Sequence, residues 1–148
     1  MDDLGIVTTR LFFAVQKHLF EQLTARGHPE VRPRHGAVLA HLGEGAKATD
    51  LALRSGRNKQ AMTRLIDELE HLGYVERQLD PQDRRVKSVV PTERGRSEVH
   101  TAREILVALD ANYAHALGDE RYSTLRTLLG QLLDHIDTIP ADRREDHP

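Results

Sequence analysis

The chain has 148 residues, of which 39% are hydrophobic and 30% charged, values that are ordinary for one globular domain with its own core. No run of about 18 apolar residues occurs, and the start Met1-Asp2-Asp3 lacks the basic region of a signal peptide, so we expect a cytoplasmic protein without a membrane segment. The absence of cysteine excludes disulfides, thiolate metal sites and cysteine-based redox sensing in this chain.

The N-terminal third predicts two helices. Residues 3–27 predict a long amphipathic helix, because apolar side chains return every three or four residues until Gly27. A second helix is predicted from Pro33 to Gly43, since proline is tolerated in a first helical turn. Residues 46–48 are compatible with a short strand, although three residues do not establish one.

Residues 49–73 predict two helices joined by a tight turn. Thr49 is a suitable N-cap for the first helix, which is predicted to end near Gly56. Asn58 is the predicted N-cap of the second, which ends at Gly73, a residue that tolerates the left-handed conformation. The apolar positions of this second helix follow the i, i+3, i+4, i+7 spacing of a buried face. They are Met62, Leu65, Ile66 and Leu69.

The opposite face of this second helix, together with the turn before it, carries side chains that bind base edges and phosphates. These positions lie in the first helical turns, where a recognition helix meets the major groove of DNA. The candidate DNA-binding residues of this segment are Arg54, Arg57, Asn58, Lys59, Gln60, Thr63 and Arg64.

Two β-prone runs, 74–79 and 86–90, enclose the proline and aspartates of a turn, so we predict a hairpin with a basic tip. The candidate DNA-binding residues of the hairpin are Asp83, Arg84, Arg85 and Lys87. An arginine at such a tip can enter the minor groove, and Asp83 is expected to orient Arg85 through a bidentate pair. The alternative is an ion pair that only stabilises the turn.

Two further helices are predicted, one of about 22 residues between Gly95 and Leu117 and one from about Glu120 to Asp137. Both carry apolar stripes, as the N-terminal helix does, and these stripes are too long for a small DNA-binding lobe to cover. We therefore predict that they pack against a second copy of the chain, with an intrachain core as the alternative.

The formal net charge of −2 conceals an uneven distribution. Residues 51–66 hold four basic and no acidic side chains, and residues 77–96 hold six basic and three acidic ones. From residue 97 onward there are five basic and ten acidic side chains. Because the local field governs the encounter with phosphates, this asymmetry favours a basic DNA-binding face on an acidic body.

The tip motif Asp-Pro-x-Asp-x-Arg at 80–85, the Val-rich strand after it and Thr-x-x-Gly at 92–95 resemble the MarR family of bacterial transcriptional regulators. Leu51-Ala52 and the run from Leu65 to Val75 fit the same family, and the resemblance covers nearly the whole chain.

By position, the resemblance places Asp83 and Arg85 at the family's wing-tip pair and residues 58–64 at its DNA contacts. Two residues depart from the family pattern. Arg57 stands where an apolar residue is usual, and Pro91 replaces the leucine before the threonine, which puts the packing at the end of the second strand in question.

The resemblance implies a fold that is mostly α with a small β wing, a winged helix-turn-helix with N- and C-terminal dimerisation helices. It implies one MarR-type domain over residues 1–148. Within that domain the expected parts are dimerisation helices at 3–30 and 96–140, a DNA-binding lobe at 31–95 and a flexible tail at 141–148.

The function implied by the resemblance is a DNA-binding transcriptional regulator, a homodimeric repressor released by a small aromatic or lipophilic ligand. Two-fold symmetry would place two recognition helices about 34–36 Å apart on an inverted-repeat operator. Candidate ligand-binding residues mix aromatic surface with a cation or an imidazole. They are Arg10, Phe12, His35 and Tyr113.

Two alternatives keep the same fold: a histidine-based metal-responsive regulator, and a winged-helix protein-interaction module without DNA binding. The first is disfavoured because no His-x-x-x-His spacing occurs, so no metal ligand is assigned. The second is disfavoured by the basic recognition face. An enzyme is not expected, because G-x-S-x-G, P-loop and HExxH motifs are all absent, and no cofactor is predicted.

Overall fold

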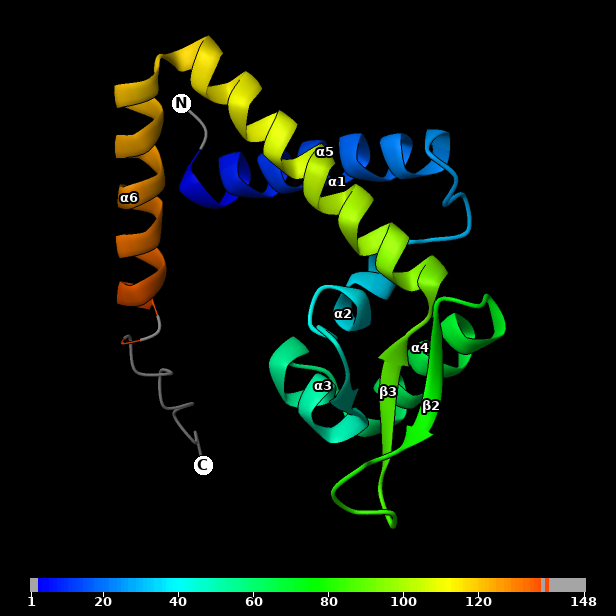
Figure 1. The fold of residues 1–148 in the computed structure, drawn as a ribbon. Helices are drawn as coiled ribbons and strands as arrows, with labels where there is room; N and C mark the ends of the chain where they lie inside the picture. Colours follow the sequence, from blue (N-terminus) through cyan, green and yellow to red (C-terminus); the bar gives the residue numbers. More distant parts are fainter. Residues whose placement is uncertain (1–2, 137, 139–148) are drawn as a thin grey trace, which may run out of the picture. The chain divides into compact units, whose positions relative to one another are not determined.

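The computed structural model describes residues 3–136 and residue 138 (Figure 1). The chain divides after Leu106 into two compact units. The predicted fold class, mostly α with a small β wing in a winged helix-turn-helix, is confirmed. Within the described residues no helix is long and apolar enough to cross a membrane. The elements are α1 (Leu4–Ala25), η1 (Pro33–His35), α2 (Gly36–Leu39), β1 (Ala46–Lys47), α3 (Ala48–Ser55), α4 (Lys59–His71), β2 (Val75–Leu79), β3 (Lys87–Pro91), α5 (Glu93–Leu117) and α6 (Asp119–Ile136).

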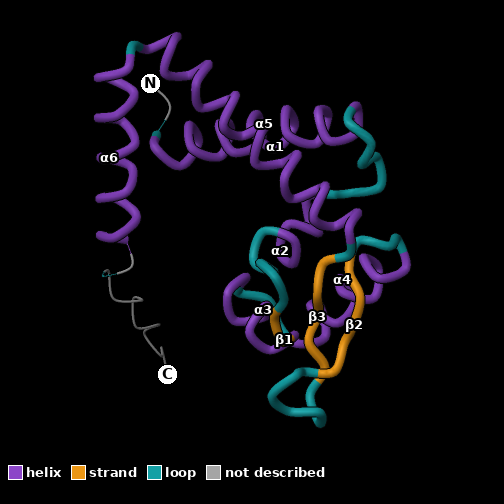
Figure 2. Tube along the Cα trace, viewed as in Figure 1, coloured by secondary structure: helices purple, strands orange, loops and turns teal. Residues whose placement is uncertain are grey.

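The three strands form an antiparallel sheet in the order β1-β3-β2, drawn in orange in Figure 2. The short strand expected at residues 46–48 is therefore confirmed, and it pairs with β3. Pro91 pairs with Val75 at the last position of β3 and is buried, so the sheet accommodates a residue that cannot donate a backbone hydrogen bond.

The helix predicted between Asn58 and Gly73 is confirmed as α4. The side-chain oxygen of Asn58 accepts a hydrogen bond from the backbone N–H of Ala61 at 2.8 Å, which is the expected N-cap. The four apolar positions of α4 are all buried, and Gly73 follows the helix with φ +80°. The core that these residues build is completed by Val31, Val38, Leu39, Leu42, Ala46, Leu51, Tyr74, Val75 and Val89.

Two predicted helix boundaries are wrong. Thr49 is not an N-cap, because α3 begins at Ala48 directly after β1 and its N-cap Lys47 makes no side-chain capping bond. The helix predicted from Pro33 to Gly43 is divided into the 3₁₀ turn η1 and the four-residue α2. Its apolar side chains are nevertheless buried as the pattern indicated.

The helix predicted to follow Gly95 begins earlier, at Glu93, so Gly95 lies inside the first turn of α5. A Cβ atom at this position would stand 2.0 Å from the backbone oxygen of Tyr74. Only glycine therefore permits this approach between α5 and the segment that joins α4 to β2.

The first turns and middle of α5 belong to the same unit as α1. Leu19, Leu23 and Ile105 form a second buried cluster, and Arg26 is ion-paired with Glu104. The N-terminal half of α1 leaves large apolar side chains exposed. These are Leu4, Ile6, Val7, Leu11, Phe12 and Phe13.

The second unit holds the end of α5, from Val107, and α6. Within it the hydroxyl of Tyr122 donates to Asp110 at 2.6 Å. No residue of α6 is buried, and its apolar stripe is exposed, at Leu125, Leu128, Leu132, Leu133 and Ile136. The predicted end of this helix at Asp137 and the predicted tail at 141–148 lie outside the described residues.

Candidate nucleic-acid interface

The helix-turn-helix forms because α3 ends at Gly56 in the left-handed conformation, with φ +67°, and Asn58 restarts the chain as α4. α3 packs against α4, and α4 packs against β2. All eleven candidate DNA-binding residues are exposed, and they lie on α3, on the turn after it, on α4, on the wing tip and at the start of β3. We call them the recognition surface. They are Arg54, Arg57, Asn58, Lys59, Gln60, Thr63, Arg64, Asp83, Arg84, Arg85 and Lys87.

Six cations of the recognition surface form no ion pair with any residue that the structure describes. By contrast, several cations elsewhere are held by carboxylates, as in the pair of Arg34 with Glu68 at 3.0 Å. Exposed, unpaired cations keep their full charge available for phosphate groups. The six are Arg57, Lys59, Arg64, Arg84, Arg85 and Lys87.

Two residues of the recognition surface form side-chain hydrogen bonds to the backbone of the same chain. Arg54 Nη1 donates to the backbone oxygen of His41 at 3.0 Å, and Thr63 Oγ1 donates to the backbone oxygen of Lys59 at 2.9 Å. The first bond orients the guanidinium of Arg54 and leaves its other N–H donors available for a partner. The second leaves the hydroxyl oxygen of Thr63 able to accept a hydrogen bond.

The wing tip is shaped by its aspartates. Asp83 Oδ1 accepts from the backbone N–H of Arg85 at 3.0 Å, and Asp80 Oδ1 accepts from the backbone N–H of Gln82 at 2.8 Å. The latter bond is the main cause of a lowered pKa at Asp80. Among the described residues no side-chain pair joins Asp83 to Arg85, so the predicted bidentate pair is wrong. The carboxylate fixes the turn instead, and the Arg85 guanidinium is left for a partner.

Sequence analysis missed a contact that attaches the wing to α4. Arg77 of β2 donates to Asp67 at 2.6 Å and also forms an ion pair with Glu70. Asp67 lies on the exposed face of α4, and its carboxylate serves this internal pair. The two acids are three residues apart on one helical face, but no spacing rule connects them to a strand beyond the turn.

The four candidate ligand-binding residues are differently placed. His35 is buried, with Nδ1 accepting from the backbone N–H of Arg32 at 3.0 Å and Nε2 donating to Glu68 at 2.9 Å. Arg10 and Phe12 are exposed on α1. Tyr113 belongs to the second unit, where its ring centroid is 6.3 Å from that of Tyr122.

A groove beside His35 is lined by none of the other three ligand candidates. Its lining comes from the segment before η1, from η1 and from the C-terminal part of α4: Pro29, Glu30, Arg32, Arg34, His35, Glu68, His71 and Leu72. Across the part of the chain that is described, no cluster of three or more His, Asp or Glu side chains has an arrangement that would hold a metal ion. His35 and His100 instead contact the carboxylates of Glu68 and Glu104.

The chain is similar to known regulators in both sequence and fold. The MarR family model matches residues 38–87, from α2 to the start of β3. CouR from Rhodococcus jostii RHA1, in a crystal structure bound to p-coumaroyl-CoA, is 30% identical, with 88% of this chain and 92% of that chain covered and a TM-score of 0.68. A transcriptional regulator of the MarR family from Rhodococcus sp. RHA1 is 29% identical with the same coverages and a TM-score of 0.66.

The transcriptional repressor CouR bound to a 23-mer DNA duplex is also similar in fold, with 22% identity, 88% of this chain and 92% of that chain covered, and a TM-score of 0.70. Curated protein sequences give no match. The family match falls on the helix-turn-helix and wing, where the unpaired cations gather, and the 30% identical relative is covered almost end to end. This chain therefore belongs to the MarR family of transcription regulators, which are winged-helix DNA-binding proteins and not enzymes.

Proposed function

We propose that the chain is a homodimeric repressor that binds an inverted-repeat operator and is released by a small aromatic or lipophilic ligand. The observation that carries the proposal is the set of six exposed cations on the α3–α4 turn, on α4 and on the wing, none of which is ion-paired with a residue that the structure describes. Cations left unpaired on one side of a protein keep their charge for a polyanion such as DNA.

The side chains divide into three roles in this proposal. The N-terminal turns of α4 enter the major groove, where Gln60, Thr63 and Arg64 reach base edges. Arg57 and Lys59 bind phosphates beside them, as does Lys87 of the wing. Arg84 and Arg85 at the wing tip approach the minor groove, where the negative potential favours arginine.

Dimerisation is supported by the apolar side chains that α1 and α6 leave exposed. Phe13 is 64% exposed and Leu133 is 65% exposed, and both stand in rows of similar side chains. Rows of this kind are typical of an interface between copies. With two-fold symmetry, the two recognition helices would meet half-sites about one DNA turn apart, roughly 34–36 Å.

The ligand proposal is supported by the relative at 30% identity, whose structure holds p-coumaroyl-CoA. A ligand changes operator affinity only through different affinities for the DNA-competent and DNA-incompetent states. Arg10, Phe12, His35 and Tyr113 are our candidates for contacts with an aromatic acyl group or its anionic part. We place this activity in the cytoplasm, where the operator is found.

The test is a titration of the full-length protein with DNA from upstream of its own gene, at several salt concentrations, with the molar mass measured in parallel. Arg85→Ala should weaken operator binding by about tenfold and lower the magnitude of the salt slope by about 1, because one cation leaves the DNA. Arg103→Ala is the matched control, since Arg103 is exposed but lies on α5. A monomer, or a protein that binds no operator at any salt concentration, would overturn the proposal.

A further inference from the structure

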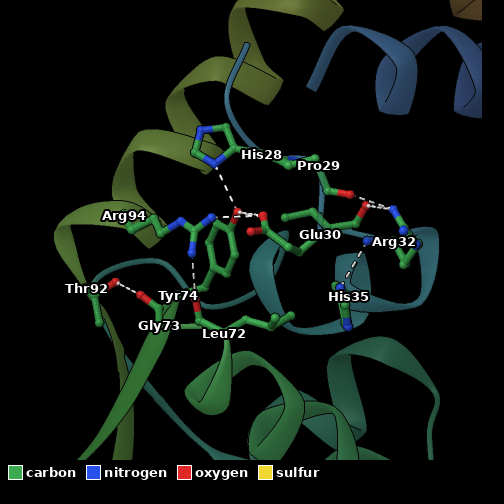
Figure 3. Close-up of polar contacts among 11 residues, drawn as sticks. His28, Pro29, Glu30, Arg32, His35, Leu72, Gly73, Tyr74, Thr92 and Arg94 are labelled. Atoms are coloured by element: carbon green, nitrogen blue, oxygen red, sulfur yellow. Dashed lines mark hydrogen bonds and ion pairs between the residues drawn. The ribbon is translucent and has the colours of Figure 1, made fainter. Parts of the chain in front are cut away.

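The C-terminal end of the recognition helix is held by residues that the proposed DNA contacts do not use. Arg94 Nη1, from the first turn of α5, donates to the backbone oxygen of Leu72 at 2.8 Å, and Thr92 Oγ1 donates to that of Gly73 at 2.6 Å (Figure 3). The last carbonyls of a helix lack partners within it, and a cation there also suits the helix dipole. Arg94 of α5 and Thr92 directly before α5 thereby supply donors to the carbonyls at the end of α4.

The same arginine is fixed on two more sides. Its guanidinium carbon lies 4.4 Å from the centre of the Tyr74 ring, and its Nη2 donates to Glu30 Oε2 at 2.8 Å. The hydroxyl of Tyr74 donates to that same carboxylate oxygen at 3.3 Å and lies 3.2 Å from Nδ1 of the buried His28. We call this group of five residues, His28, Glu30, Tyr74, Thr92 and Arg94, the Tyr74 junction.

Figure 3 shows that the Tyr74 junction joins three separate segments: the segment between α1 and η1, the end of α4 and the start of α5. Its electrostatics agree with this geometry. The hydrogen bond from Arg94 holds the pKa of Glu30 below its ordinary value, and burial raises the pKa of Tyr74 to about 12. The carboxylate is thus charged and the phenol protonated throughout the neutral range, so the bonds between them persist.

Arg94 stands far from the end of α4 that meets DNA in the proposed function. The helix has 13 residues, so its two ends are about 20 Å apart at 1.5 Å per residue. A tilt of about 3° at the C-terminal end would displace the N-terminal end by about 1 Å, enough to spoil hydrogen bonds to base edges. The angle of the helix is therefore as important as the side chains it carries.

We propose that Arg94 is a positioning residue for operator recognition: by holding Leu72, Tyr74 and Glu30 together, it sets the angle at which α4 presents its N-terminal turns. This inference rests on the proposed function. It assigns Arg94 to specific binding only, since Arg94 supplies no charge to the DNA itself.

The test compares Arg94→Met, Arg94→Lys and the neighbouring control Arg96→Met in the full-length protein. Methionine keeps an aliphatic side chain over Tyr74 but loses every donor, while lysine keeps the cation without the planar fork of donors. Kd is measured for the operator and for an unrelated duplex, each against salt concentration, together with Tm.

Arg94→Met should weaken operator binding by about tenfold, while binding to the unrelated duplex and the salt slope stay as in the wild type. The operator Kd of Arg94→Lys should lie between those of the wild type and Arg94→Met. The operator Kd of Arg96→Met should match the wild type within about twofold, since the ion pair of Arg96 is exposed, with 3.8 Å between its Nε and a carboxylate oxygen of Glu44. A salt slope lower by about 1 would instead identify Arg94 as a direct phosphate contact and overturn the inference. An unchanged operator Kd with a lowered Tm would show a purely structural role and overturn it as well.

If Arg94→Met does not fold, Glu30→Gln takes its place. This change keeps an acceptor for Arg94 and Tyr74 but removes the charge, and it should weaken operator binding in the same direction by about threefold; an unchanged Kd would overturn the inference. Wild type and Arg85→Ala are measured in the same series. Operator binding by the wild type, weakened in Arg85→Ala, upholds the proposed function even where the inference about Arg94 fails.

Discussion

The recognition surface and the Tyr74 junction use the same kinds of side chain in opposite ways. On the recognition surface, Arg57, Arg84 and Arg85 are exposed and no residue in the described part of the chain pairs with them. In the junction, Arg94 binds a carboxylate, a carbonyl and an aromatic ring at once. An arginine without internal partners is available for another molecule, whereas an arginine with three partners fixes the geometry of its own chain.

This difference predicts how substitutions divide. A change on the recognition surface should alter binding and leave the free energy of unfolding almost unchanged, because little is buried there. A change in the junction, or in the first turns of α5 beside it, should alter the free energy of unfolding first, because close packing and satisfied hydrogen bonds are lost together. The following changes test that division.

The largest effect on stability is expected at Gly95. An alanine Cβ would lie 2.0 Å from the Tyr74 backbone oxygen, so α5 or the start of β2 must move. We expect Gly95→Ala to lower the free energy of unfolding by about 4 kcal/mol or more, measured by urea denaturation. Gly36→Ala is the control: nothing lies within 4 Å of its Cβ position, and a change of at most about 1 kcal/mol is expected. Equal effects at the two sites would contradict the close packing described between Gly95 of α5 and the backbone of Tyr74.

The next largest effect on stability is expected at Glu98, as a dependence of the free energy of unfolding on pH. It lies on α5 one turn beyond Arg94, is only 4% exposed, and burial raises its pKa from 4.5 to about 7. Between these values the unfolded chain has released the Glu98 proton while the folded chain retains it, so stability falls as pH rises. The full loss across this interval is about 3 kcal/mol.

The measurement is the free energy of unfolding of the wild type and of Glu98→Gln from pH 4.5 to pH 8. Glutamine cannot ionise, so the difference between the two proteins should grow with pH up to about 7 and then level off. Other titrating groups contribute equally to both proteins and cancel. A difference that stays constant with pH would show that the pKa of Glu98 is the same in the folded and the unfolded chain.

The smallest effect on stability is expected at Asn58, on the recognition surface. Aspartate caps a helix as well as asparagine does, so Asn58→Asp should change the free energy of unfolding by less than about 0.5 kcal/mol, while Asn58→Ala should cost about 1 kcal/mol. Operator affinity should fall by about tenfold in Asn58→Asp at low salt, because a negative charge then faces the phosphates. Operator affinity that is equal in the wild type and Asn58→Asp would place the end of α4 away from the DNA.

The helix-turn-helix and the hairpin were predictable because their signals are local. Asn58 caps α4, the apolar spacing runs along this helix and Gly73 follows it, and the wing tip is a single turn between two β-prone runs. Each of these follows from backbone preferences or from periodicity. The boundary at Thr49 was mispredicted because a strand pairing, formed with residues some forty positions later, decides where α3 begins.

The Tyr74 junction was not predictable from the sequence. Glu30 and Arg94 are 64 residues apart, and Glu30 and Tyr74 are 44 apart, so no helical or strand period connects them. The Thr-x-x-Gly motif at 92–95 is part of the family resemblance, but the sequence does not show what these two residues contact. The structure shows those contacts: Thr92 binds the carbonyl of Gly73, and Gly95 lets the backbone of Tyr74 pass.

The short strand β1 has a consequence for the spacing between the two proposed DNA contacts of one copy of the chain. β1 runs straight into α3 and is hydrogen-bonded to β3, and Lys47 Nζ lies 3.9 Å from Asp80, which follows β2 where the wing tip begins. In the proposed function, these contacts would fix the number of base pairs between the major-groove contact of the helix-turn-helix and the neighbouring minor-groove contact of the wing. In an assembly of two copies, that interval within each half-site would stay constant, and only the interval between the half-sites would remain adjustable.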